Sequence, residues 1–296
     1  MREKTRMTKQ TKNQFHILSL GAGVQSTMLY LLAVEKHPLM EKVTHAIFAD
    51  TGEEPESVYS HLEWLMSLDG PEILVRSVGH RLGDNLLIGE NSTGQRFASV
   101  PFFTAAREGV KDGITRRQCT SEYKIAVVEK CIRREIVGLK YRQHMPKNVT
   151  VHQYMGLSFD EPKRVLKTCL RFDNIKWAIP HFPLFETNTT RKICAEWLKS
   201  RVTHEVPRSA CVFCPYHSDA EWLRVKENPR DWARAVEIDH GIRKDGVVVN
   251  LNMDMSLYAH SSCLPLDQVE FKTEGNDGQM EFCFSEFGCD TGMCGT

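Results

Sequence analysis

The sequence predicts an α/β fold built on a largely parallel sheet. Short β-prone runs at 15–20, 43–49 and 73–78 alternate with helix-compatible stretches at 26–37 and 54–68. This alternation is what right-handed parallel crossovers require. The chain is 41% hydrophobic and 26% charged, which is typical of soluble globular proteins with a packed core. We therefore expect a Rossmann-like sheet flanked by helices, followed by a smaller helical, cysteine-containing region.

The first two helices carry their own start and stop signals. Pro38 ends the first helix, because proline cannot continue the hydrogen-bond ladder. Pro55 lies in the first turn of the second helix, where its missing N–H is tolerated. Val58, Leu62 and Leu65 then recur on one face of that helix and predict its buried side.

The middle of the chain changes character. Residues 80–117 lack clear periodicity and hold five glycines, so we expect a long loop of the kind that closes over a ligand. Apolar residues at helical spacing predict a helix over 121–137, and 149–155 is a further predicted strand.

Three regions follow from these patterns: a flexible basic tail at 1–14, an α/β domain at 15–200, and a C-terminal helical and cysteine region at 201–296. In the last region Ser218 and Glu221 form a capping box. Asn228 and Pro229 open another helix.

Charge and cysteine content restrict the functional classes. The chain has 38 Lys plus Arg and 38 Asp plus Glu, so attraction to nucleic acid, if present, must be local. The longest apolar run, 28–34, is far shorter than the about 20 residues of a membrane span. Ten cysteines without an export signal are expected as cytoplasmic thiols or metal ligands rather than as a disulfide framework.

A glycine turn, Gly21-Ala22-Gly23-Val24-Gln25-Ser26-Thr27, lies between the first strand and the first helix. Helix N-terminal amides converge at such a turn, and small residues let a phosphate approach the backbone. The alternative is a tight connection without a ligand. The turn is neither a Rossmann fingerprint nor a Walker loop.

These residues resemble the PP-loop superfamily and, within it, the phosphoadenosine phosphosulfate reductase family. The family's S-G-G-x-D-S loop aligns with Gly21 to Ser26, with Gly21 replacing the leading Ser and Gln25 replacing the Asp. The chain is also similar to a phage and bacterial subgroup with the Gly-Ala-Gly-Val-Gln-Ser loop. The resemblance implies an adenine-nucleotide alpha hydrolase-like fold that binds ATP or phosphoadenylyl sulfate, with Mg²⁺ possible although Gln25 carries no charge to attract it.

Four more segments match the family in order. Asp50-Thr51-Gly52 resembles its D-T-G stretch, and Cys119 begins a segment like its C-C-x-x-R-K, with Thr120 replacing the second Cys. Gly156 begins a segment like G-x-R-x-D-E, with Ser158 in place of the Arg, and Pro183-Leu184-Phe185 resembles the P-L-x-x-W entry without its Trp. The nucleotide-binding residues that the resemblance implies are Gly21, Ala22, Gly23, Val24, Gln25, Ser26, Thr27, Asp50, Thr51, Gly156, Asp160, Arg116, Arg117 and Arg164. For Asp50 the alternative role is a turn residue, and for the arginines it is solvated surface charge.

Cys211-Val212-Phe213-Cys214 places two thiolates on one turn, which suits zinc or an iron-sulfur cluster. The resemblance implies that Cys119 joins Cys211 and Cys214 around a 4Fe-4S cluster, with Cys289 or Cys294 as the fourth ligand. The alternative is structural zinc on Cys211, Cys214, His217 and one more cysteine.

Two cysteines are catalytic candidates. Cys119 belongs to the matched segment, and Cys294, before Gly295, faintly resembles the nucleophilic tail cysteine of the reductases. Their chemistry would be sulfur transfer or sulfonate reduction.

Three functions remain in view. The first is ATP-dependent adenylation and sulfur transfer to tRNA, DNA or a small acceptor, with the basic stretch Arg116 to Arg142 contacting phosphates or forming a solvated helix face. It requires a sulfur donor. The second is reduction of an adenylyl-sulfate by a thiol reductant. The third is a nucleotide-binding accessory protein with structural zinc.

Overall fold

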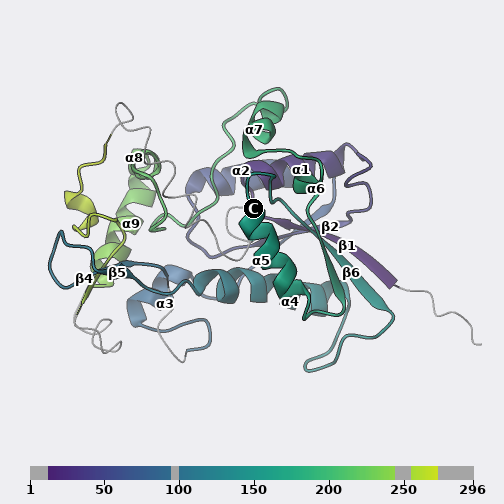
Figure 1. The fold of residues 1–296 in the computed structure, drawn as a ribbon, viewed down its shortest axis with the longest axis horizontal. Helices are drawn as coiled ribbons and strands as arrows, with labels where there is room; N and C mark the ends of the chain where they lie inside the picture. The colour runs from purple at the N-terminus through teal and green to yellow at the C-terminus, as the bar shows by residue number, and fades with distance from the viewer. Residues whose placement is uncertain (1–12, 95–99, 244–254, 273–296) are drawn as a thin grey trace, which may run out of the picture.

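A five-stranded, all-parallel sheet forms the centre of the chain in the computed structural model, which describes residues 13–94, 100–243 and 255–272. The strand order is β3-β2-β1-β6-β7 (Figure 1). The predicted α/β class is therefore confirmed. The first strand begins at Asn13, inside the segment 1–14 that was expected to be a flexible tail. The strands are β1 (Asn13–Leu20), β2 (His45–Ala49), β3 (Glu72–Arg76), β6 (Val149–Met155) and β7 (Ala178–His181).

The inner strands carry buried apolar side chains on both faces because helices cover both faces of the sheet. Ile17 and Leu18 of β1 point to opposite faces, and neither side chain has any exposed surface. On β2, Ala46 and Ile47 are equally buried. Strand order reverses between β1 and β6, so the loops that leave these two strands diverge at the carboxyl edge, which is where ligands bind in open parallel sheets.

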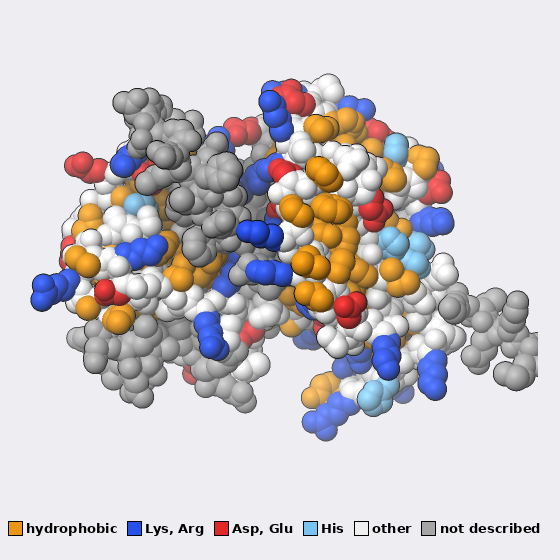
Figure 2. Space-filling model, viewed as in Figure 1, with side chains coloured by type: hydrophobic (Ala, Val, Ile, Leu, Met, Phe, Trp, Pro, Cys, Tyr) orange, Lys and Arg blue, Asp and Glu red, His pale blue; other side chains and the backbone are white. Residues whose placement is uncertain are grey.

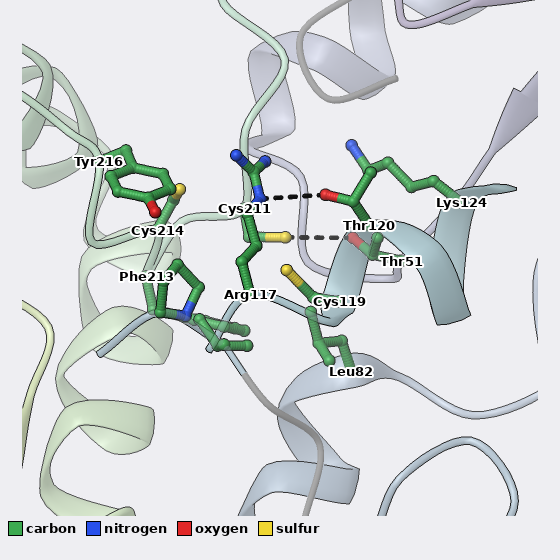
Figure 3. Close-up of a pocket in the computed structure, with 12 residues that line it drawn as sticks. Thr51, Leu82, Arg117, Cys119, Thr120, Lys124, Cys211, Phe213, Cys214 and Tyr216 are labelled. Carbon is green, nitrogen blue, oxygen red and sulfur yellow. Dashed lines mark hydrogen bonds between the residues drawn. The ribbon is translucent and has the colours of Figure 1, made fainter. Parts of the chain in front are cut away.

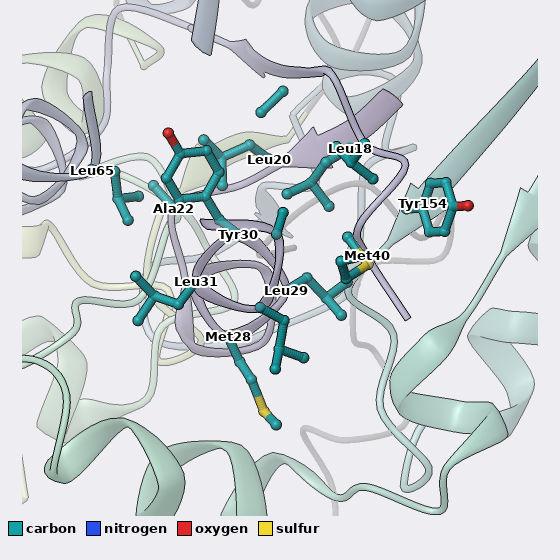
Figure 4. Packing of buried hydrophobic residues seen from close by; sticks show 14 of the residues in the cluster. Leu18, Leu20, Ala22, Met28, Leu29, Tyr30, Leu31, Met40, Leu65 and Tyr154 are labelled. Carbon is teal, nitrogen blue, oxygen red and sulfur yellow. The ribbon is translucent and has the colours of Figure 1, made fainter. Parts of the chain in front are cut away.

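One face of the sheet is covered by α1 (Val24–Val34), α2 (Glu56–Met66) and α7 (Arg191–Lys199). Figure 4 shows the side chains that pack around α1, with Leu18 and Leu20 of the sheet against Leu29 and Tyr30 of the helix. The opposite face is covered by α4 (Ala126–Cys131) and α5 (Pro162–Phe172).

The segment 80–117 is more regular than the sequence predicts. It contains α3 (Leu82–Ile88), β4 (Phe103–Ala105) and β5 (Gly113–Ile114), and β4 pairs antiparallel with both β5 and the distant β8 (Ser256–Tyr258). Short regular elements therefore replace part of the expected loop, and its closure over a ligand stays a prediction. Such short elements carry no periodicity of their own, and the strand pairing with β8 is too remote to be read locally.

A second hydrophobic core joins these elements to the C-terminal helices. Leu82 and Phe102 pack in one cluster with Phe213, Trp222 and Ile238. The cluster therefore contains residues from both of the predicted regions, 15–200 and 201–296. The remaining elements are α6 (Pro183–Glu186), α8 (Asp219–Glu227), α9 (Pro229–Gly241) and η4 (Leu266–Gln268).

The predicted helix over 121–137 forms, but its hydrogen bonding is mixed. It runs as a π segment η1 (Thr120–Ile125), the regular α4, and a second π segment η2 (Ile132–Ile136). Short π segments within helices are frequent at functional sites. Here η1 brings Thr120 and Lys124 to the carboxyl edge of the sheet.

Both predicted caps in the C-terminal region are confirmed. Ser218 Oγ accepts from the Glu221 amide at 3.4 Å, and the Glu221 carboxylate accepts from the Ser218 amide at 2.8 Å. Asn228 Oδ1 accepts from the amides of Arg230 and Asp231. None of the helices within the described ranges is both long enough and apolar enough to cross a bilayer.

Candidate functional site

The glycine turn connects β1 to α1 as predicted, and the side chain of Ser26 hydrogen-bonds to the backbone of the turn. Ala22 adopts a positive φ of 56°, and Gly21 to Gly23 are buried. Ser26 Oγ accepts from the amides of Gly21 and Gly23, each at 3.2 Å, and donates to the Gly23 carbonyl. Two of the turn's amides therefore already have a partner within the chain. Anion binding by this turn stays a prediction.

Gly156, at the end of β6, presses against the first turn of α1. A Cβ atom at this position would lie 2.9 Å from the Ser26 amide nitrogen and 3.1 Å from the Gln25 carbonyl carbon. Both neighbours are backbone atoms, which cannot move aside cheaply. Glycine is therefore required here so that β6 can reach the turn.

Gln25 belongs to a buried polar network. Its Nε2 donates to Ser158 Oγ at 3.3 Å and to Glu161 Oε2 at 3.1 Å. Because the carboxylate only accepts, it fixes the orientation of the amide. The buried Gln25 Oε1 then has no partner among the described residues. This orphaned acceptor suits a donor such as a ligand hydroxyl or a water, and its lack of charge does not fit Mg²⁺.

Asp50 follows β2 and is used by its own turn. Its Oδ1 accepts from the Gly52 amide at 2.7 Å and from the Tyr59 hydroxyl at 2.8 Å. Burial and the Asp50 charge raise the pKa of Tyr59, so this phenol stays protonated and donates. The geometry supports the turn role that was the alternative for Asp50.

Thr51, Cys119, Cys211 and Cys214 line one pocket at the carboxyl edge of the sheet (Figure 3). The Thr51 hydroxyl lies 3.4 Å from Cys211 Sγ. Figure 3 shows the thiols of Cys119 and Cys211 on facing sides of the pocket, whereas that of Cys214 lies farther away beside Tyr216. Two segments far apart in sequence, one with Cys119 and one with Cys211 and Cys214, therefore contribute cysteines to the same pocket.

Lys124 is the main site residue that the sequence reasoning missed. It lines both the cysteine pocket and a smaller pocket bounded by Gly21 and the end of β2, so it lies between the turn and the thiols. Its Nζ donates to Glu54 Oε1 at 3.0 Å, and Ser209 Oγ donates to Glu54 Oε2. Lys124 is the last residue of the matched segment that begins at Cys119, and this position was the available signal. Lysine and glutamate are usually surface residues, so the sequence did not indicate a buried pair.

Glu53, also missed, anchors the C-terminal region to this edge. Its fully buried carboxylate accepts from Arg234 Nη2 at 2.7 Å, from Arg81 Nη2 at 3.2 Å and from the Gly83 amide at 3.0 Å. The Val212 amide donates to the Glu53 carbonyl, which places the turn of Cys211 beside Thr51. Burial of this acid is compensated by charged and amide donors.

The thiol of Cys211 is protonated in this environment. Burial raises its pKa well above the usual value, and the neighbouring Glu54 carboxylate raises it further. Lys124 and the Thr51 hydroxyl act in the opposite direction but are the smaller causes.

The described residues do not complete a metal site. Within the described ranges no three or more His, Cys, Asp or Glu side chains are arranged to hold a metal ion. His217 lines a different pocket from the cysteines, and burial lowers its pKa to about 3. Cys289 and Cys294, the predicted fourth ligand and tail nucleophile, lie outside the described residues. The cluster and zinc hypotheses both stay predictions.

Three of the other predicted nucleotide-binding residues have local partners. Asp160 Oδ1 accepts from the Arg191 amide at 3.1 Å at the start of α7, and Arg164 pairs with Glu161. Arg117 Nε donates to Thr120 Oγ1 at 3.1 Å, and the Arg117 guanidinium lies over the Tyr216 ring at the pocket. Arg116, beside it in the chain, is exposed.

The basic stretch from Arg116 to Arg142 spans the 17-residue helix 120–136, whose ends are about 25 Å apart at 1.5 Å per residue. At the far end, Arg133 and Arg134 donate to the carbonyls of Gln143 and Leu139. Contact of this stretch with phosphates stays a prediction.

Comparison of the chain with protein-family models, with curated proteins and with solved structures gives no match.

Proposed function

We propose that the chain is a PP-loop-type enzyme that activates an acceptor with ATP and transfers sulfur to it through the cysteine pocket. The observation that carries this proposal is the position of Lys124. Its side chain lies between the β1–α1 turn and a pocket that holds both Cys119 and Cys211. An anionic nucleotide at the turn and a thiol nucleophile would thus share one edge of the sheet.

The turn and Lys124 bind the nucleotide in this proposal. The Lys124 ammonium is the cation nearest to Gly21 in the smaller pocket, and its pairing with Glu54 holds it in place. The orphaned Gln25 Oε1 accepts from a ligand hydroxyl, such as that of a ribose. Because Gln25 is neutral and the metal site is incomplete in the described ranges, no step is assigned to Mg²⁺, zinc or an iron-sulfur cluster.

The reaction balances with two thiols. An acceptor oxygen attacks the α-phosphorus of ATP, and pyrophosphate leaves. A persulfide on Cys119, supplied by a sulfur donor, attacks the activated carbon, and AMP leaves. The Cys211 thiol then attacks Cys119 Sγ as its proton passes to the departing sulfur, which releases the acceptor as a thiol and forms a Cys119–Cys211 disulfide. An external thiol reductant restores both thiols.

A nucleic acid is the preferred acceptor class. The exposed Arg116 lies next in the chain to Arg117, which lines the pocket, so a phosphate backbone could be held at its mouth. A small acceptor would not need this contact. Arg116→Ala should therefore weaken turnover with a nucleic acid and leave turnover with a small acceptor unchanged.

The test measures AMP and pyrophosphate from ATP in the presence of a persulfide donor and tRNA or DNA. Wild-type protein should release both in equal amounts and label the acceptor with sulfur, whereas Cys119→Ser and Cys211→Ser should not label it. Cys169→Ser is the matched control, because Cys169 is also a half-buried cysteine but does not line the pocket. Labelling that survives loss of either pocket thiol would refute the mechanism.

Reduction of an adenylyl-sulfate is the second candidate. It is favoured by the two thiols in one pocket, which can supply two electrons while forming a disulfide. Sulfite release from an adenylyl-sulfate, with no AMP and pyrophosphate from ATP, would select this activity instead.

A further inference from the structure

The loop between η2 and β6, residues 138–148, exposes basic and aromatic side chains and contains no acid. Figure 1 shows this loop at the lower right, before β6, and Figure 2 shows Lys and Arg side chains gathered at the same place. We call the exposed basic and aromatic residues of the loop the β6 loop surface; they are Lys140, Tyr141, Arg142, His144 and Lys147.

The charge of this region departs from that of the whole chain. The chain has no formal net charge, but residues 130–148 hold six Lys and Arg and only one acid, Glu135. That acid is already paired, since its carboxylate accepts from Arg76 Nε at 2.8 Å. The positive charge of the loop is therefore not balanced by acids within the segment. A local excess of one sign attracts a polyanion even when the protein as a whole is neutral.

Tyr141 is held at the tip of an ordered turn. The Gln143 amide donates to the Lys140 carbonyl at 3.0 Å, and the Lys140 amide donates to Gln143 Oε1 at 2.9 Å. Arg133 of η2 donates from Nη2 to the Gln143 carbonyl at 2.7 Å, which ties the turn to the helix. Because the turn is already ordered, less conformational entropy is lost when Tyr141 contacts a partner.

The ring of Tyr141 combines exposure with neighbouring cations. It is 78% exposed, so it is not part of the core. The guanidinium groups of Arg134 and Arg142 lie 5.5 Å and 5.2 Å from its centre. An exposed ring on which a base can stack, next to cations that attract phosphates, is the combination that binds single-stranded nucleic acid.

Two other polyanions fit this loop less well. An anionic membrane requires several apolar side chains that enter the lipid, but Leu139 is buried and Met145 and Pro146 are half-buried, which leaves Tyr141 alone. A duplex keeps its bases paired and stacked on each other, so none is free to stack on Tyr141.

We propose that the β6 loop surface binds an unpaired segment of nucleic acid, with Tyr141 stacking on a base and Lys140, Arg142 and Lys147 contacting phosphates. The loop precedes β6 and so lies at the amino edge of the sheet, whereas the cysteine pocket lies at the carboxyl edge. It is therefore a second site. The proposal concerns binding alone and does not depend on the sulfur transfer proposed above.

The test is the fluorescence anisotropy of a labelled oligouridylate of about 12 nucleotides, titrated with the full chain without ATP or a sulfur donor. The wild-type chain should bind it, and more weakly as salt is added. Tyr141→Ala should raise the Kd at least about fivefold, whereas Tyr141→Phe, which keeps the ring, should not. Lys140→Gln and Lys147→Gln should each reduce the slope of log K against log salt by about 0.7.

Lys192→Gln on α7 is the matched control, because Lys192 is also an exposed lysine but lies on another element. It should change neither the Kd nor the salt slope. A duplex of the same length should bind more weakly and should not respond to Tyr141→Ala. Circular dichroism verifies that all variants remain folded.

Three results would overturn the proposal. The first is no binding of oligouridylate or oligothymidylate at about 100 µM protein, and the second is an equal effect of Lys192→Gln and Lys147→Gln. The third is binding to phosphatidylserine vesicles that Tyr141→Ala abolishes, without binding to either oligonucleotide, which would assign the surface to a membrane. Binding of either oligonucleotide that Tyr141→Ala weakens supports the proposal, and the tighter of the two distinguishes RNA from DNA as the source.

Discussion

Gln25 donates a hydrogen bond to Ser158 at 3.3 Å, across 133 positions of sequence. In the structure these two neutral side chains contact each other and the same carboxylate, that of Glu161, which also pairs with Arg164. The neutral pair adds no second charge to the buried network, so the charge of Glu161 stays balanced by that of Arg164.

The neutral pair predicts a specific double-mutant result. Gln25→Asp places a second carboxylate beside Glu161 in a buried site, so the free energy of unfolding should fall by about 3 kcal/mol. Adding Glu161→Gln should recover at least about 1 kcal/mol, because only one carboxylate then remains in the site. Urea denaturation of the single and double variants measures the coupling. Gln14→Asp on the exposed start of β1 is the control, and strictly additive effects would contradict the prediction.

Gly156 supplies a second prediction. Gly156→Ala drives a Cβ atom against the backbone of Gln25 and Ser26, so it should lower the free energy of unfolding by about 1–3 kcal/mol. It should also shift the amide resonances of the β1–α1 turn. Gly113→Ala is the control, because its added Cβ meets only a side-chain hydroxyl, that of Thr104. Similar losses for both variants would mean that the turn has room to move.

The central sheet could be predicted because its signals are local. The buried parallel strands are rich in apolar and β-branched residues, and glycine or proline marks the helix boundaries, so β1, β2 and β6 follow from the residues alone. Strands β4 and β5 have three and two residues; β5 pairs with β4, and β4 pairs with β8, which lies about 150 positions farther along the chain. No local pattern encodes that pairing.

The site could be predicted in part for the same reason. Cys119, Cys211 and Thr51 were named from motifs, and the structure brings them to one pocket. Lys124 and Glu54 could not be singled out, because the sequence does not distinguish a buried Lys–Glu ion pair from a solvated one. Burial depends on which segments cover the pair, here the cysteine turn and η1, and that is a property of the tertiary fold.

The buried ion pair gives a third prediction. Lys124→Met leaves the Glu54 carboxylate buried beside Ser209 without its cation, which should cost about 3–5 kcal/mol of unfolding free energy. Lys124→Met with Glu54→Gln should cost much less, since no uncompensated charge remains. Lys199→Met is the matched control: its ion pair with Glu196 has the same 3.0 Å distance but is exposed, and its loss should cost less than about 1 kcal/mol. Equal losses at both sites, measured by urea denaturation, would show that Lys124 is solvated in solution.

Acid sensitivity follows from His61, whose ring joins Thr27 Oγ1 at 2.9 Å to His204 at 2.7 Å. Burial, and then the neighbouring His204, lower the pKa of His61 to about 4 from 6.5. Between these two values the unfolded chain binds the proton more tightly. The stability that the neutral ring contributes is therefore fully present above pH 6.5 and is lost as the pH falls to about 4, by up to about 1.4 kcal/mol per pH unit. His61→Gln should reduce this slope in thermal unfolding between pH 6.5 and 4, whereas His37→Gln, at an exposed position, should not. An NMR titration that places the pKa of His61 near 6.5 would refute the assignment.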